Sequence, residues 1–218
     1  MIAGAGHVVL VGPEFGEAEN GKSVEYALQP EPCYWFPIRA THRRARKVYD
    51  RLVALNDGRL EPYLPTISRV EYPDDASGEP VVREEPLDSG LLFIRCTLTD
   101  FRKLLENPLL VPGMTPYYNH FETNKSGKNE YLTVPDRQMD SFRIIVESRN
   151  NDILVRQTEV PQFIEGDSVV VTGGPFAGVE GVVMKYKHQK RVVVQIEGVG
   201  CYATAYVPSA FLKLKMEN

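Results

Sequence analysis

The side chains that most often carry catalysis or metal binding are few in this chain, and they are widely spaced. The 218 residues include four histidines and three cysteines, at His7, His42, His120, His188, Cys33, Cys96 and Cys201. None of them has the spacing of a zinc site, and the chain lacks a Cys-x-x-Cys pair, a phosphate-binding loop and a Gly-x-Ser-x-Gly motif. Neighbouring carboxylates such as Glu84 and Glu85 tend to diverge along a strand instead of converging on one substrate. The sequence therefore predicts a protein that is not an enzyme and that holds no metal and no cofactor.

A cluster of basic residues indicates a different chemistry, contact with a nucleic acid. The cluster consists of His42, Arg43, Arg44, Arg46, Lys47 and Arg51. It lies opposite the stripe Ala45, Val48 and Leu52, which has the spacing of a helix packed on a core. Positive charge near a helix N-terminus opposes the helix dipole, which suggests a purpose other than helix stability. Arginine can hold phosphates and stack on unpaired bases, whereas the alternative, a solvated helix face, is what most charge runs form.

The composition limits how extensive such a contact can be. The net charge is -4 and the sequence pI is about 5.7. A protein whose main task is to grip a nucleic-acid backbone has a basic footprint, so the contact must be a local patch, or the main partner is a protein. Three widely separated cysteines fit a reducing cytoplasm, and the apolar stretch at residues 7–11 is far too short to span a membrane. The expected location is the cytoplasm, without membrane contact.

A glycine-rich run over residues 165–183 is the strongest local signal in the sequence. It predicts a strand, a turn and a second strand, and the residues that define the turn are Gly173, Gly174, Phe176, Gly178 and Gly181. Glycine adopts positive φ in turns without strain, and Gly181 within a strand permits a bulge or the close approach of another backbone. Phe176 is expected to drop from the turn into the end of a barrel. The simpler alternative is an ordinary glycine-rich β-hairpin.

The elements that must position these residues fall into two differently patterned segments. Residues 33–146 predict strands at 33–39, 60–70, 91–96 and 114–121, and helices that begin at Thr41, Thr99 and Pro135. The continuously apolar run 91–96 is expected at the centre of a sheet. Residues 147–162 predict a polar linker, and residues 163–218 predict five short strands at 168–172, 179–186, 191–197, 202–207 and 211–215. Residues 1–32 predict a loosely ordered extension.

The order of these elements and motifs resembles the NusG family of transcription factors. The run from Glu165 to Val183 is similar to the KOW motif of NusG-like and ribosomal proteins. The motifs at residues 34–36, 64–65, 89–94 and 133–136 follow the order of the NusG N-terminal (NGN) domain. The likeness is closest to specialised members such as RfaH and the antiterminators of capsular-polysaccharide operons. It implies an α+β fold class: an NGN-type α/β sandwich with an antiparallel sheet, then an all-β SH3-like KOW barrel.

The resemblance also implies a function and a partner. It implies a monomeric elongation factor or operon-specific antiterminator that binds the clamp helices of RNA polymerase through an apolar sheet surface and suppresses pausing and termination. The matching apolar positions are Trp35, Phe36, Tyr63, Leu91 and Phe93; the alternative is that these side chains are plain core. The basic cluster would then face the non-template DNA strand or the nascent RNA.

Two departures from the family pattern limit what is carried over. The family has Pro-Gly-Tyr before the central strand, where this chain has Ser89-Gly90-Leu91. The loop at residues 198–202 lacks the phenylalanine through which general NusG proteins contact a ribosomal protein or a termination factor. A ribosomal protein or another elongation factor therefore stays only a candidate partner of the barrel. The competing function is a ribosome-associated KOW module that binds RNA or protein without a polymerase.

Overall fold

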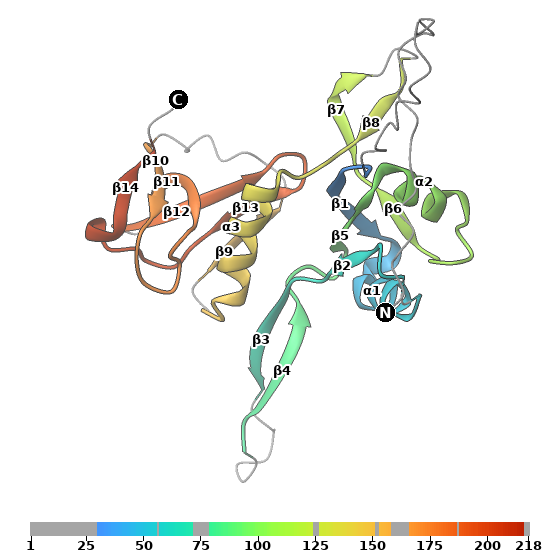
Figure 1. Ribbon diagram of the computed structural model, residues 1–218. Coiled ribbons are helices and arrows are strands. Elements are labelled where there is room, and N and C mark those ends of the chain that lie inside the picture. The colour runs from blue at the N-terminus through green and yellow to red at the C-terminus, as the bar shows by residue number, and fades with distance from the viewer. Residues whose placement is uncertain are drawn as a thin grey trace, which may run out of the picture.

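The computed structural model describes residues 30–55, 57–71, 79–123, 127–150, 153–157, 166–186 and 188–215. The predicted extension therefore lies outside the described residues, apart from its last three positions. The described chain forms a four-stranded and a six-stranded antiparallel sheet and two further hairpins, with helices beside them (Figure 1). This is a mixed α/β architecture followed by a strand-rich C-terminal region.

The four-stranded sheet organises the first half of the chain. Its strands are β1 (Cys33–Ala40), β2 (Glu61–Tyr63), β5 (Leu91–Thr97) and β6 (Met114–Pro116), and they lie in the order β2-β5-β1-β6. The apolar strand β5 is internal, as predicted. β1 is internal too, although Pro37 favours an edge position. The proline is tolerated because β6 pairs with β1 only from Ile38 onward. Pairing with β6 therefore needs no backbone N–H at Pro37.

One face of this sheet packs on two helices, α1 (Ala45–Ala54) and α2 (Leu98–Glu106). Successive strand residues point to opposite faces, so Phe36 and Ile38 join Leu92 and Ile94 on this side. The Phe36 ring stacks on Phe101 of α2 at 4.0 Å. This cluster is the core of the first module.

Both helices begin elsewhere than the sequence suggests. Thr41 does not cap α1; it opens a 3₁₀ turn, η1 (Thr41–Arg43), because His42 and Arg43 adopt left-handed φ values of 54° and 55° that interrupt the helix. α2 is capped by Thr97, whose hydroxyl oxygen accepts a hydrogen bond from the Asp100 backbone N–H at 3.1 Å. A threonine at that position satisfies one of the unpaired donors of the first turn.

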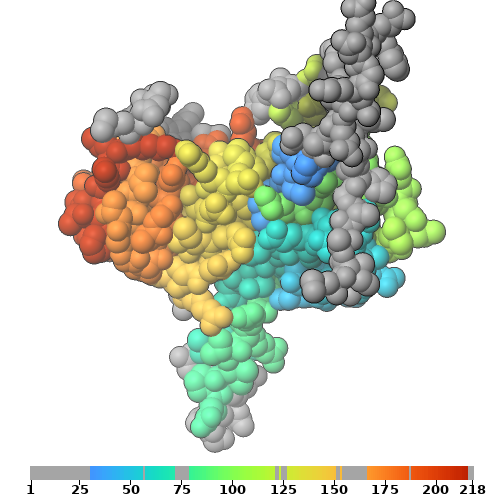
Figure 2. Space-filling model, viewed as in Figure 1, coloured from blue at the N-terminus to red at the C-terminus, as the bar shows by residue number. Residues whose placement is uncertain are grey.

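Two hairpins extend from the first module. They are formed by β3 (Thr66–Glu71) with β4 (Val81–Pro86), and by β7 (Tyr118–Thr123) with β8 (Asn129–Tyr131). Figure 2 shows the β3–β4 hairpin projecting as a finger from the body of the molecule. The single strand predicted at 114–121 is in fact two strands, since β6 ends at Pro116, which has no N–H to continue a ladder.

The six-stranded sheet forms the C-terminal region. Its strands are β9 (Leu154–Gln157), β10 (Ser168–Val171), β11 (Glu180–Tyr186), β12 (Gln189–Ile196), β13 (Gly200–Ala203) and β14 (Leu212–Leu214), with a 3₁₀ turn, η2 (Ser209–Phe211), before the last. Five of them match the strands expected from the sequence. β9 lies inside the predicted linker and pairs with β13, so the linker contributes an edge strand to the C-terminal sheet.

The helix α3 (Asp136–Glu147) connects the two halves (Figure 1). It begins directly after Pro135, and Met139, Phe142 and Ile145 are buried, as its helical spacing predicts. One apolar cluster runs from the second face of the first sheet through α3 into the C-terminal strands. α3 is therefore packed on both sides.

Candidate interaction surfaces

Four of the five residues predicted to dock on polymerase share one surface. Trp35, Tyr63, Leu91 and Phe93 all belong to the apolar cluster that includes α3. Phe36 does not, because strand alternation places it on the opposite face, against α2. The sequence therefore assigned Phe36 to a surface that only Trp35 of these two neighbours reaches.

This apolar surface is covered. Trp35, Leu91 and Phe93 expose 4%, 2% and 0% of their area, which corrects the expectation of an open apolar sheet face. The ring of Phe142 on α3 lies 5.4 Å from Phe93 and 6.4 Å from Tyr63. Burial of Tyr63 also raises the pKa of its phenol well above the usual value. The apolar anchors are thus packed beneath α3.

The other side of α3 contacts the C-terminal strands. Phe142 lies 4.4 Å from the ring of Tyr202 on β13. The Ser141 hydroxyl accepts a hydrogen bond of 3.0 Å from the backbone N–H of Glu180. A side chain added at Gly178 would meet the Cδ1 atom of Ile144 at 3.3 Å. α3 therefore packs closely on the C-terminal strands through an aromatic contact, a hydrogen bond and the close approach of Ile144 to Gly178.

The basic cluster is exposed along its whole length. His42, Arg43, Arg44, Arg46, Lys47 and Arg51 are all exposed, while Ala45, Val48 and Leu52 are buried beneath them. The sequence placed these residues correctly relative to the core. The first turn of α1 contains no acidic residue, so the positive charge there is not neutralised locally.

The strained turn at the start of this surface is held by three hydrogen bonds from other loops. The Arg43 Nε donates to the Ser89 hydroxyl at 2.9 Å, and the Ser89 carbonyl accepts from the Ala45 N–H at 2.8 Å. The Thr41 N–H donates to the Gly113 carbonyl at 2.9 Å. Ser89 thus positions Arg43. Left-handed φ in a non-glycine residue costs of order 1–3 kcal/mol and persists where neighbours hold it.

The glycine turn of the C-terminal region adopts the geometry that its sequence predicts. Gly174 and Gly178 have φ values of 78° and 93°, and Phe176 is buried in the apolar cluster. A Cβ at Gly181 would lie 2.2 Å from the Val193 carbonyl oxygen of the neighbouring strand. Gly173 is required for a different reason than expected: φ there is not positive, but the Phe211 ring lies 3.1 Å from where its Cβ would be.

Sequence reasoning missed one further surface, a cleft between the β7–β8 hairpin, α2 and the turn after β12. Its exposed tyrosines, Tyr34 and Tyr118, come from strands far apart in sequence. The only sequence feature that could have indicated this cleft is the aromatic content of β7 and β8, and this is equally typical of core strands.

Within the described residues, no group of three or more His, Cys, Asp and Glu side chains is placed to hold a metal ion. None of the helices in that part of the chain is long and apolar enough to cross a membrane.

Comparison with known protein families matches one of these features. The family model described as the KOW motif matches residues 165–197, from three residues before β10 to one residue after β12. No curated protein matches the chain. The matched segment contains the glycine turn, the buried Phe176 and the close approach at Gly181. The chain is a KOW-containing protein, and this motif is typical of nucleic-acid-binding or ribosome-associated modules.

Proposed function

We propose that this protein is a NusG-like transcription elongation factor that binds the clamp helices of RNA polymerase and suppresses pausing and termination. The observation that carries the proposal is the combination of two features in one chain. A KOW motif follows a helix-flanked antiparallel sheet, and the second face of that sheet gathers the aromatic and aliphatic anchors Trp35, Tyr63, Leu91 and Phe93. Buried aromatic anchors of this kind dominate the energetics of protein interfaces.

Docking in this proposal is a competition between polymerase and the C-terminal strands. The anchors lie in a cluster that α3 and the strands around Tyr202 share, so they are inaccessible in the arrangement described. Polymerase would bind a form in which the C-terminal region has moved away from α3 and α3 has then shifted off the anchors that it covers. A ligand shifts such an equilibrium only by its differential affinity for the two forms. The closed contact therefore lowers the apparent affinity for polymerase by the fraction of molecules that are open.

The basic surface of α1 supplies the second contact of the proposed mechanism. It lies on the face of the sheet opposite to α3, so both surfaces can be engaged at once. Exposed arginines next to a polymerase-bound sheet would hold the phosphates of the non-template strand or the nascent RNA. Holding the clamp closed and the strand in place disfavours the paused state.

Charge reversal at the start of α1 tests whether its basic residues contact nucleic acid and not the polymerase clamp. In the variant Arg43→Glu/Arg44→Glu we expect terminator read-through by purified polymerase to fall at least fivefold, while polymerase binding changes less than twofold. The reason is that these side chains would contact nucleic acid and not the clamp. The matched control is Lys213→Glu on the edge strand β14, which should leave both quantities unchanged. Equal loss of binding and read-through would contradict a nucleic-acid role.

A ribosome-associated module is the second candidate, because the KOW motif itself fits that class. The two candidates differ in which half of the chain makes the primary contact. Retention of the protein by stalled elongation complexes, lost when residues 33–146 are deleted, supports the polymerase factor. Co-sedimentation with ribosomes through residues 163–218 alone, without polymerase retention, supports the ribosomal module.

A further inference from the structure

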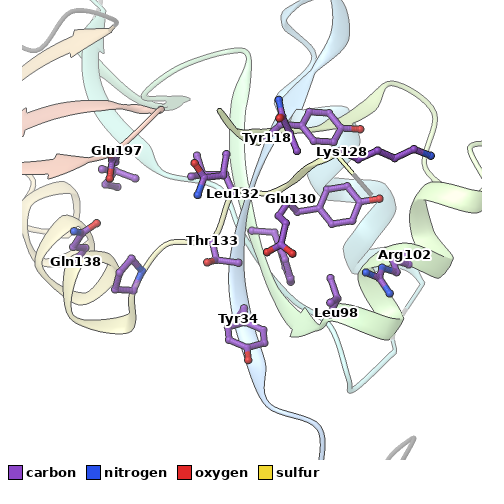
Figure 3. Close-up of a pocket in the computed structure, with 17 residues that line it drawn as sticks. Tyr34, Leu98, Arg102, Tyr118, Lys128, Glu130, Leu132, Thr133, Gln138 and Glu197 are labelled. Carbon is purple, nitrogen blue, oxygen red and sulfur yellow. The ribbon is translucent and has the colours of Figure 1, made fainter. Parts of the chain in front are cut away.

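A cleft of about 1070 Å³ opens at a distance from the basic surface of α1 (Figure 3). Its walls come from five parts of the chain: the start of β1, the helix α2, the β7–β8 hairpin, the segment from Leu132 to the first turn of α3, and the turn after β12. The last wall belongs to the KOW motif, which reaches Glu197. The cleft is thus built jointly by both halves of the protein.

The cleft presents two exposed aromatic rings on a rigid base. Tyr34 and Tyr118 expose 42% and 44% of their area. Each of them contacts a ring that is better buried: Tyr34 lies 6.3 Å from Phe36, and Tyr118 lies 5.6 Å from Tyr131. Tyr131 in turn lies 5.2 Å from Phe101.

The two ends of this series are joined through the core, since Phe101 stacks on Phe36. Each exposed tyrosine therefore lies against a series of rings that continues into the core. A rigid exposed ring loses little conformational entropy when a flat ligand stacks on it.

The charged side chains that line the cleft are two cations and two carboxylates. Arg102 of α2 and Lys128 of the hairpin lie on one side, and Glu197 lies on the opposite wall (Figure 3). Glu130 lies between them, with Thr133 close by. Cations along one wall suit a phosphate backbone, whereas carboxylate and hydroxyl groups further in suit the edges of unpaired bases.

We propose that this cleft binds single-stranded nucleic acid, with two unpaired bases stacked on Tyr34 and Tyr118 and the phosphates running past Arg102 and Lys128. Stacked aromatic platforms beside a cationic track are the general solution for single strands. A duplex is disfavoured because its bases are already stacked and Glu197 on the opposite wall would repel its second strand. The proposal stands independently of polymerase docking, since it needs only the protein and an oligonucleotide.

The experiment measures fluorescence anisotropy of labelled eight-nucleotide RNA and DNA with the full-length chain. All variants carry Arg43→Gln/Arg44→Gln/Arg46→Gln, so that binding at α1 does not mask the cleft. In this background we expect the double variant Tyr34→Ala/Tyr118→Ala to bind at least tenfold more weakly, because two stacking contacts are lost. The matched control Tyr206→Ala removes a tyrosine that is 52% exposed on the C-terminal region, outside the cleft, and should leave the affinity unchanged.

Two further measurements separate a binding role from a structural one. Tyr34→Phe/Tyr118→Phe keeps both rings and should restore most of the affinity. Two phosphate contacts predict a slope of roughly -1.4 for the logarithm of the binding constant against that of salt concentration, and Arg102→Gln should reduce its magnitude by about 0.7.

Unchanged oligonucleotide affinity in the double alanine variant would overturn the proposal. So would equal weakening by Tyr206→Ala, or loss of binding only through unfolding, detected as a failure of the phenylalanine variant to rescue. If the cleft variants abolish binding of a proline-rich peptide and not of oligonucleotides, the cleft is a peptide site and the proposal is wrong.

Discussion

At the residue scale, alternation along β1 and β5 decides which side chains reach which surface. The sequence identified an aromatic run at residues 34–36, but treated Trp35 and Phe36 as one surface. In a strand they must point to opposite sides, and Phe36 stacks on Phe101 in the core of the first module. Arg191, the first residue of a strand predicted from the sequence, is a charged side chain that is nevertheless buried. Its guanidinium donates to the Thr204 carbonyl at 3.1 Å.

The glycine turn was the most predictable local feature, because its geometry depends on near neighbours. The substitution Gly181→Ala tests whether this geometry is needed for stability. A Cβ there would lie 2.2 Å from the backbone oxygen of Val193, which cannot move aside without breaking the β11–β12 pairing. We expect a loss of about 2 kcal/mol or more in the free energy of unfolding, measured by urea denaturation.

Gly58→Ala is the control for this substitution, because nothing lies within 4 Å of a Cβ at that position. It should change stability by less than about 0.5 kcal/mol. A neutral Gly181→Ala would mean that the close approach between β11 and β12 does not exist in solution.

At the element scale, the strands and helices were predictable where one periodicity dominated. β5 lies close to its predicted position because its apolar run is continuous, and α3 does so because its buried residues recur at helical spacing. The start of α1 was not predictable, since it depends on contacts with Ser89 and Gly113 from distant loops. β9 was hidden for a related reason: a four-residue segment becomes a strand only when the edge of β13 is available to pair with it.

α3 is the element on which both halves depend. Phe142 contacts Phe93 of the first sheet and Tyr202 of the C-terminal sheet. Phe142→Ala should lower the free energy of unfolding by about 3–5 kcal/mol, because a fully buried ring leaves a cavity bordered by both sheets. Thermal denaturation, monitored by circular dichroism, measures this loss of stability.

Leu109→Ala, at a side chain that is 84% exposed, is the control and should be neutral within about 0.5 kcal/mol. A small effect of Phe142→Ala would indicate that α3 does not connect the two sheets.

At the scale of the whole molecule, the two proposed contacts lie on opposite faces of one sheet. α1 and its basic residues cover one face, while α3 and the C-terminal strands cover the other. The sequence predicted both sets of residues but not the closed arrangement, because no local pattern encodes how two connected modules pack on each other. The apolar anchors are buried beneath α3, which packs in turn on the C-terminal strands.

The most direct test is the affinity of elongating RNA polymerase, taken from the organism that encodes the chain, for two matched variants. Ile144→Glu places a charge against Gly178 at the contact between α3 and the C-terminal strands, whereas Asp140→Asn alters an exposed position of the same helix. The account predicts that Ile144→Glu binds polymerase at least fivefold more tightly than the wild type, and that Asp140→Asn does not differ from it. Absence of polymerase binding by all three proteins, or weaker binding by a folded Ile144→Glu variant, would contradict it.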